Sequence, residues 1–168
     1  MKASFESVYD ENFKYIYNYL YAQTLHRETA EDLSMDVFVR AMEHYGGYDP
    51  AKASVRTWLV TIARNTLINH LRSAKIRKTK NLEDAPEPGK MDEYSFRQNA
   101  ISEEVARILT KLKPEERELL AMRYMMEMDN SAIGNVVGLD SKTVSQRIMR
   151  LLQKCRKLTE GRELLEDD

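Results

Sequence analysis

The sequence lacks the features that define several common classes of protein. It has one cysteine, Cys155, so it can form no disulfide bond within the chain, which fits a reducing compartment. No apolar run approaches the roughly 20 residues that a membrane-spanning helix requires. Residues 1–13 carry acids and no apolar core segment, so no signal peptide is expected. These absences predict a soluble, cytoplasmic protein without stable insertion in a membrane.

Side chains that commonly perform catalysis or bind metals are few and scattered. The three histidines lie far apart in the sequence, no metal-ligand spacing occurs, and no glycine-rich loop could hold a phosphate. Cys155 leaves two interpretations open, because nearby cations can lower a thiol pKa, whereas most lone cysteines are ordinary small side chains. We therefore predict no enzymatic activity, no cofactor and no metal.

Acidic residues are missing from two long stretches of a chain whose formal net charge is −1. No Asp or Glu occurs between Pro50 and Leu82 or between Ser141 and Thr159, and both stretches are rich in Lys and Arg. Phosphate binding depends on local clusters of cations rather than on total charge. The segregation predicts two separate surfaces for nucleic acid.

In the first half, the apolar residues recur at the spacing of amphipathic helices, and no strand pattern competes with it. Helices are expected over 5–21, from about Glu28 to Gly46, and over 54–72, with Leu71 among the buried residues of the third. The tyrosines of the first helix are expected mainly in the core rather than stacked on bases. The second helix has a buried stripe and, mostly outside it, an exposed set. The stripe is Ala30, Leu33, Val37, Phe38 and Ala41, and the exposed set includes Asp32, Met35, Asp36, Val39 and Met42.

Between residues 74 and 99 the helical period disappears. This segment is first basic, then acidic and proline-bearing, which is typical of an exposed linker. The sequence thus predicts an all-α protein of two small helical domains, residues 1–73 and 100–160. A flexible linker over 74–99 joins them, and an acidic tail follows over 161–168.

The second domain has the pattern of a helix-turn-helix. Pro114 is expected to open one helix, with Tyr124 on its apolar side, and Asp129 to cap a short one. Gly138 then turns the chain into a basic final helix, which Asp140 or Ser141 is expected to cap. In this motif the second helix enters the major groove of DNA. An ordinary helical hairpin with a solvated basic face is the structural alternative. The apolar stripe of the final helix is Val144, Ile148, Leu151, Leu152 and Leu158, and five residues lie off it: Lys142, Ser145, Gln146, Met149 and Arg150.

Two segments carry a resemblance to a known family. TAEDLSMDVFVRAM followed by YDPAKASVRTWLVTIARNTLINHLR resembles the promoter-binding region 2 of extracytoplasmic function (ECF) sigma factors of the sigma-70 superfamily. LTKLKPEERELLAMRYMMEMDNSAIGNVVGLDSKTVSQRIMRLLQKCRK resembles their region 4. Together the segments cover about three quarters of the chain, in the order that the family uses. The resemblance implies a transcription initiation factor that binds core RNA polymerase and promoter DNA, with an anti-sigma factor as a further partner.

The resemblance also implies roles for individual residues. Asp32, Met35 and Asp36 would dock on core polymerase, and the Asp49–Ser54 loop would help to capture a flipped base. The −10 element would be bound by Arg56, Arg64, Asn65, Asn69 and Arg72, with the arginines on phosphates and the amides on bases. The −35 element would be bound by Lys142, Ser145, Gln146, Arg147, Met149 and Arg150. Trp58 could stack on a base, although its place on the apolar stripe favours core packing.

The second segment departs from the usual family pattern at three positions. Glu127 stands where glycine is frequent, Gly134 where alanine is frequent, and Ser145 where a basic residue is common. Gly134 is expected to weaken its helix by up to about 1 kcal/mol relative to alanine.

Two other classes of function remain open from the sequence. A stand-alone helix-turn-helix transcriptional regulator would bind duplex DNA tightly without polymerase, usually as a dimer. A helical enzyme or scaffold would gather polar residues in a pocket.

Overall fold

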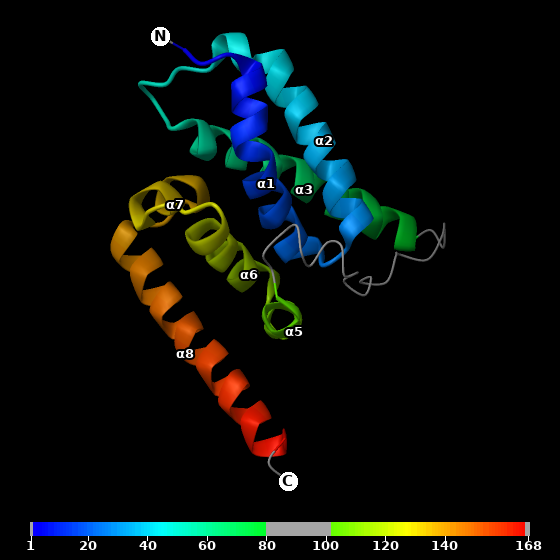
Figure 1. Cartoon of the computed structure of the whole chain (residues 1–168), viewed down its shortest axis with the longest axis vertical. Coiled ribbons are helices and arrows are strands. Elements are labelled where there is room, and N and C mark those ends of the chain that lie inside the picture. The colour runs from blue at the N-terminus through cyan, green and yellow to red at the C-terminus, as the bar shows by residue number, and fades with distance from the viewer. Residues whose placement is uncertain (1, 80–101, 167–168) are drawn as a thin grey trace.

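The structure, a computed structural model, describes residues 2–79 and 102–166, and all regular structure in these ranges is helical (Figure 1). The predicted fold class is confirmed. Residues 80–99 of the expected linker and residues 167–168 of the expected tail lie outside the described residues.

The first unit consists of three long helices, α1 (Phe5–Thr24), α2 (Arg27–His44) and α3 (Val55–Thr79), with a short 3-10 turn η1 (Tyr45–Gly47) after α2. The Ser4 hydroxyl accepts the Ser7 N–H at 3.2 Å and so caps α1. Helices α1 and α2 run antiparallel and side by side (Figure 1). α3 packs against both of them.

The core of this unit forms where the sequence predicted it. The stripe predicted on α2, from Ala30 to Ala41, is buried throughout. Tyr17, Tyr19 and Tyr21 of α1 are also buried, so the interpretation of these tyrosines as core residues was right. Burial of large aromatic side chains contributes much of the hydrophobic stabilisation of a small helical unit.

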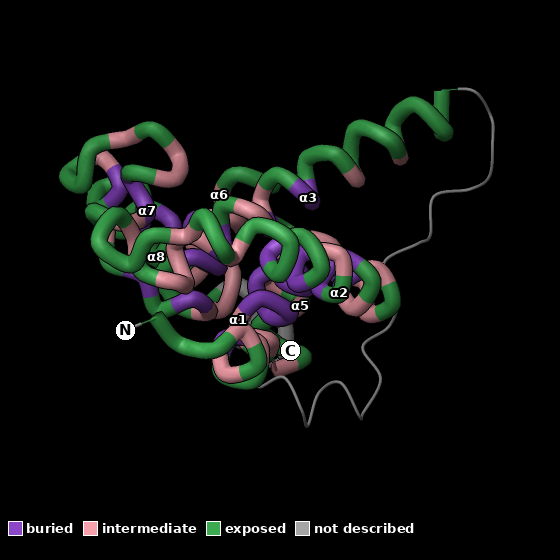
Figure 2. The backbone as a smooth tube through the Cα atoms, turned by 90° about the horizontal axis from the view of Figure 1, so that it is seen from above, coloured by how far each residue is buried: buried purple, intermediate pink, exposed green. Residues whose placement is uncertain are grey.

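α3 is longer than predicted and continues past Arg72 to Thr79. Its last turns project away from the body and are almost entirely exposed (Figure 2). Leu71 was expected on the buried side but is 52% exposed, because no described helix packs against this part of α3.

The second unit consists of α5 (Glu103–Thr110), α6 (Pro114–Leu120), η2 (Ala121–Met125), α7 (Asn130–Val137) and α8 (Ser141–Glu166). As predicted, Pro114 opens α6, where its missing N–H leaves no bond unmade. η2 is one turn of π-helix, which shifts the helical register relative to α6. Tyr124, expected on the apolar side, is consequently exposed.

α7 and α8 form the predicted helix-turn-helix. The Asp129 carboxylate accepts the Ala132 N–H at 2.8 Å at the start of α7. Gly138 ends α7 at a φ of 76°, a left-handed conformation that glycine adopts without steric cost. The Asp140 carboxylate accepts the Thr143 N–H at 2.7 Å and caps α8.

Gly134 is required because the backbone of Leu139 lies close to it, a contact that the sequence did not reveal. A Cβ atom at this position would lie 2.3 Å from the Leu139 carbonyl oxygen. The Gly134 carbonyl in turn accepts the N–H groups of Gly138 and Leu139 at 2.8 and 3.0 Å. The expectation that Gly134 only weakens α7 is wrong, because the turn folds back onto this residue.

The two units pack against each other. α1 contacts α5, α6 and η2, and α3 contacts α7. Tyr19 and Leu20 of α1 belong to the same buried cluster as Met122 and Met126. Part of α3 lies in this contact, so only the rest of the helix is open to solvent.

Candidate nucleic-acid interface

α8 presents a polar face beside a buried one. Val144, Ile148 and Leu151 anchor the helix, each at most 5% exposed. Leu152, also expected on the buried side, is exposed. All residues predicted to bind the −35 element are exposed along the first turns of α8: Lys142, Ser145, Gln146, Arg147, Met149 and Arg150.

Farther along α8, a basic side chain is tied to α6. The Lys154 ammonium donates to the Glu116 carboxylate at 2.8 Å, and Glu116 also accepts the Lys113 backbone N–H at 2.9 Å. Bonds from Lys154 and Lys113 hold the pKa of the Glu116 carboxyl below its ordinary value. Lys154 therefore fixes α8 against α6, whereas the neighbouring Arg156 is largely exposed.

α3 carries a second polar face. Asn65, Asn69 and Arg72 are all exposed, and their spacing of four and three residues aligns them on one side of the helix. The exposed cations Lys75, Arg77 and Lys78 continue along the projecting turns. This face combines amides that can bond base edges with cations that can bind phosphate.

Arg56 and Arg64 were predicted to hold phosphates, but here both are paired with acids of the second unit. Arg56 lies 3.1 Å from the Glu127 carboxylate, and the Arg64 Nε donates to Glu118. Each arginine side chain is only about a third exposed, at 32% and 33%. Sequence periodicity gave no signal of these pairs, because the partners lie more than fifty residues apart.

Trp58 belongs to an aromatic cluster next to the Asp49–Ser54 loop, and the sequence analysis predicted its packing but not its partners. The rings of Trp58 and Tyr48 lie 4.8 Å apart, and Tyr45 contacts both. The Tyr48 hydroxyl donates to the Ala53 carbonyl at 2.9 Å and so closes the loop. Trp58 is half-buried, consistent with the packing role favoured above. Its partners Tyr45 and Tyr48 flank Gly46-Gly47 in the sequence, and this local group of aromatic residues could have indicated the cluster.

α2 has an exposed face that combines apolar and acidic side chains. Met35, Val39 and Met42 are 52%, 47% and 57% exposed and follow one another at helical spacing. Asp32 is exposed beside them, and Asp36 is half-buried and pairs with Arg40 at 3.3 Å. An apolar stripe left on a helix surface and flanked by acids is typical of a protein-binding face.

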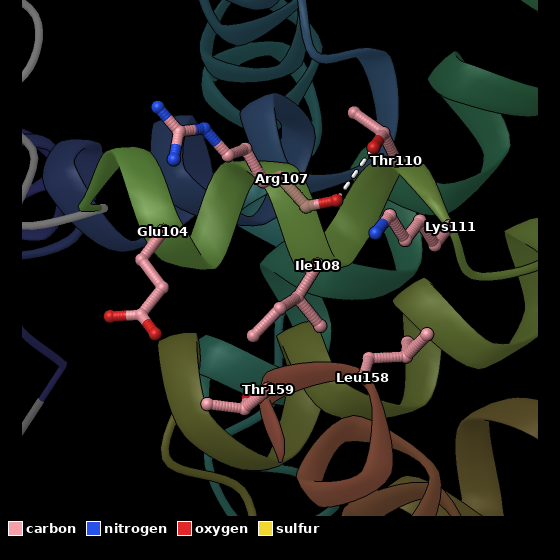
Figure 3. A pocket seen from close by; sticks show the side chains of 7 residues that line it. All are labelled: Glu104, Arg107, Ile108, Thr110, Lys111, Leu158 and Thr159. Carbon is pink, nitrogen blue, oxygen red and sulfur yellow. Dashed lines mark hydrogen bonds between the residues drawn. The ribbon is translucent and has the colours of Figure 1, made fainter. Parts of the chain in front are cut away.

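A hollow lies between α5 and the end of α8 (Figure 3). Ile108 of α5 points toward Leu158 and Thr159 of α8, and Glu104 and Lys111 stand at the rim. None of the site residues predicted from the sequence lines this hollow.

The described residues contain no cluster of three or more His, Cys, Asp or Glu side chains that could hold a metal ion. Within the same residues, no helix has both the length and the apolar character needed to cross a membrane.

Cys155 is half-buried on α8, and burial raises its thiol pKa above the ordinary value, with a further contribution from Glu116. Of the two interpretations above, this favours the ordinary side chain. We expect alkylation of Cys155 to reach half its maximal rate at a higher pH in the folded protein than in guanidinium chloride, because only the thiolate reacts. Rates of iodoacetamide labelling across pH 7 to about 10 measure this. A lower midpoint in the folded protein would contradict the assignment.

The fold and these faces define a two-unit helical protein with a helix-turn-helix and two polar, basic helix surfaces. Family models match both units: sigma-70 region 2 over residues 8–76 and sigma-70 region 4 over residues 102–155. The chain is 32% identical to the RNA polymerase sigma factor YlaC of Bacillus subtilis, and the match covers 95% of each protein. It is 26% identical to the ECF RNA polymerase sigma factor SigM of the same organism, over 91% of this chain and 93% of SigM.

Solved structures show the same fold. The sigma factor RpoE of Bartonella quintana, solved in complex with the anti-sigma factor NepR, has a TM-score of 0.71 at 16% identity, covering 93% of this chain and 96% of that one. CnrH, solved in complex with the cytosolic domain of CnrY, has a TM-score of 0.63 at 21% identity, covering 94% and 88%. The chain belongs to the sigma-70 family of RNA polymerase sigma factors and is of the ECF type.

Proposed function

We propose that this chain directs core RNA polymerase to promoters and initiates transcription there, using α8 to recognise a −35 element and α3 to open a −10 element. The observation that carries the proposal is the presence, in family order on one chain, of region 2 and region 4, each with an exposed polar and basic helix face. The protein has no catalytic activity of its own in this role and works in the cytoplasm. The domain limits remain those proposed from the sequence, 1–73 and 100–160.

The exposed face of α2 is the proposed docking surface for core polymerase. Asp32, Met35 and Asp36 contribute to it, and the structure adds Val39 and Met42, whose exposed apolar side chains support a protein contact. An anti-sigma factor is a further proposed partner. The support is indirect, because it rests on the complex in which the similar RpoE was solved.

Asn65, Asn69 and Arg72 form the part of the proposed −10 surface that is exposed in this structure. The amides would bond a base only after it has left the duplex, and Arg72 would bind a nearby phosphate.

We expect Asn69→Ala to slow promoter opening about three- to tenfold, because one hydrogen bond to a captured base contributes about 0.5–1.5 kcal/mol. Initial binding of duplex DNA should change less, since the base is still stacked at that stage. The rate at which promoter thymines become reactive to permanganate measures opening. Asn135→Ala, which removes an exposed amide from α7, serves as the control. Opening of the Asn69 variant at the wild-type rate would remove this residue from the base-capturing surface.

Gln146 and Arg150 lie one helical turn apart on the exposed face of α8 and are proposed to contact bases of the −35 element. We expect Gln146→Ala or Arg150→Ala to change preference at one or two −35 positions, by about 1–3 kcal/mol for a bidentate contact. Arg156→Ala, farther along the helix, should weaken all promoters about equally, as loss of a phosphate contact does. Transcription from a library randomised at −35 separates the two outcomes. A uniform loss in the Gln146 and Arg150 variants would contradict the recognition role.

Lys154, although basic and on the same helix, is not proposed to contact phosphate, because its ammonium is paired with Glu116. A stand-alone helix-turn-helix regulator is the rival function, but it has no use for the region 2 that residues 8–76 match.

Transcription in vitro with purified core polymerase on genomic fragments tests the proposed function, with start sites mapped at nucleotide resolution. The proposal predicts transcripts from defined starts that depend on this protein and share upstream −35 and −10 sequences. Transcription that is independent of the protein, or unfocused starts in its presence, would overturn it.

A further inference from the structure

The beginning of the chain is bound to the aromatic cluster beside the Asp49–Ser54 loop. Its contacts are with Tyr45, which lies more than forty residues away in the sequence. The Tyr45 hydroxyl donates to the Ala3 carbonyl, and the Lys2 ammonium donates to the Tyr45 carbonyl. The Phe5 ring meets the Tyr45 ring edge-on, with 5.5 Å between the ring centres. Tyr45 is therefore held by three residues at the start of the chain.

The Lys2 ammonium also lies over two rings of this cluster. It is 4.5 Å from the centre of the Tyr45 ring and 5.6 Å from the centre of the Tyr48 ring. A cation within about 6 Å of a ring centre is attracted by the negative face of the ring. The two tyrosine rings are stacked, with 5.9 Å between their centres and 17° between their planes. Lys2 therefore helps to hold both rings in this arrangement.

Tyr48 connects the stacked rings to the loop and to α3. The centre of its ring lies 4.8 Å from that of Trp58 on α3, and its hydroxyl donates to the Ala53 carbonyl at 2.9 Å. Within the loop, the Asp49 carboxylate accepts the Ala51 N–H at 2.9 Å, which shapes the turn. The tip of the loop stays exposed. The loop is thus held at its base and open to solvent at its tip.

The position of this loop matters because it leads directly into α3. The exposed face of α3 carries Asn65 and Asn69, so the loop stands at the beginning of the proposed −10 surface. A loop that already has its bound shape loses less conformational entropy when it takes up a ligand. How closely that shape is kept depends on the residues that support the loop from behind.

We propose that Lys2 and Tyr48 are positioning residues for opening of the −10 element. Lys2 acts through the stacked tyrosine rings, and Tyr48 acts through its bond to Ala53. The inference rests on the proposed function, in which α3 opens the −10 element, and on the base capture implied above for the loop. Neither residue has to touch DNA in this role. Loss of either lets the loop move, so a base is captured less selectively, whereas −35 recognition by α8 is unaffected.

Two substitutions remove these contacts with little change in shape. Tyr48→Phe keeps the ring and removes only the hydroxyl that is bonded to Ala53. Lys2→Met keeps an unbranched side chain and removes the ammonium, and Lys2→Arg restores a cation. Tyr124→Phe and Lys14→Met are the matched controls, because each makes the same chemical change at an exposed position away from the loop.

Transcription with core polymerase from a promoter library randomised at −10 tests the role in base capture. We expect Tyr48→Phe to lower the preference at one −10 position about three- to tenfold, because loss of one hydrogen bond lowers the population of the held loop by that factor. Lys2→Met should lower the preference at the same position, Lys2→Arg should restore most of it, and −35 preference should match the controls. A purely structural role would instead lower the free energy of unfolding and weaken all −10 sequences alike. That result, or −10 preferences equal to those of the controls, would overturn the proposal.

Hydrogen exchange of the loop amides in the free protein separates this inference from the proposed function. Peptides covering residues 49–54 should exchange faster in Tyr48→Phe and in Lys2→Met than in either control, because the loop opens more often. Exchange no faster than in the controls would overturn the link from Lys2 to the loop. If the wild type fails to direct transcription, the proposed function fails, and the exchange result still decides whether these residues hold the loop.

Discussion

Replacing Asp32 and Asp36 together with arginine is expected to weaken association with core RNA polymerase about a hundredfold. Both acids flank the exposed apolar stripe of α2, where Met35 is 52% exposed. Like charges brought together at an interface cost several kcal/mol, and a loss of about 2.7 kcal/mol is a hundredfold change in affinity. The fold should survive, because the Asp36–Arg40 pair lies at the surface with both side chains about half exposed, and surface pairs contribute little.

Co-elution with core polymerase in size-exclusion chromatography, followed by titration of fluorescently labelled protein, measures this loss. Glu6→Arg combined with Asp10→Arg is the matched control. It reverses two exposed acids at the same four-residue spacing on α1. If the α2 variant is folded and binds polymerase like the control, this face is not the docking surface.

Gly134→Ala is expected to destabilise region 4 by about 2 kcal/mol, within the range measured for overpacked sites. Alanine is the better helix former by about 1 kcal/mol, so local propensity alone predicts the opposite sign. The added Cβ would lie 2.3 Å from the Leu139 carbonyl oxygen, so the backbone of the turn must move. A shifted turn would also displace the start of α8 and reduce −35 recognition.

Urea unfolding followed by circular dichroism measures the free energy of unfolding. Gly46→Ala is the control, because a Cβ there would meet nothing within 4 Å. We expect the control to match or slightly exceed wild-type stability. A Gly134→Ala protein as stable as the control would show that the turn can relax at no cost.

Much of this fold follows from local pattern. The buried stripe of α2 and the cap at Asp129 need only helical spacing and side-chain chemistry, and both are present as predicted. Of the two caps considered for α8, Asp140 and Ser141, the structure has Asp140. The prediction failed where a helix extends beyond its partners, as at Leu71, or where the register changes, as at Tyr124 after the π-helical turn. Apolar character alone does not reveal whether a neighbouring helix is present.

The sequence predicted which candidate residues are exposed, but it did not predict which of them are paired with acids of the other unit. Asn69 and Gln146 are exposed as expected, because they lie off the apolar stripes. The pairing of Arg56 with Glu127 depends on how two separately patterned units meet, and no local period encodes that. Glu127 and Gly134 were visible as departures from the family pattern. The structure gives Gly134 a geometric reason, the close approach of Leu139, whereas Glu127 has a left-handed φ of 54° that would suit glycine and pairs its carboxylate with Arg56.

Promoter binding measured in three mixtures tests the central claim most directly. A labelled duplex containing mapped −35 and −10 elements is titrated with this protein alone, with core polymerase alone, and with both together. The sigma factor account predicts sequence-specific binding and strand opening only when both are present, with weak binding by the protein alone. Tight, sequence-specific binding of the duplex by the protein alone, unchanged by core polymerase, would contradict it.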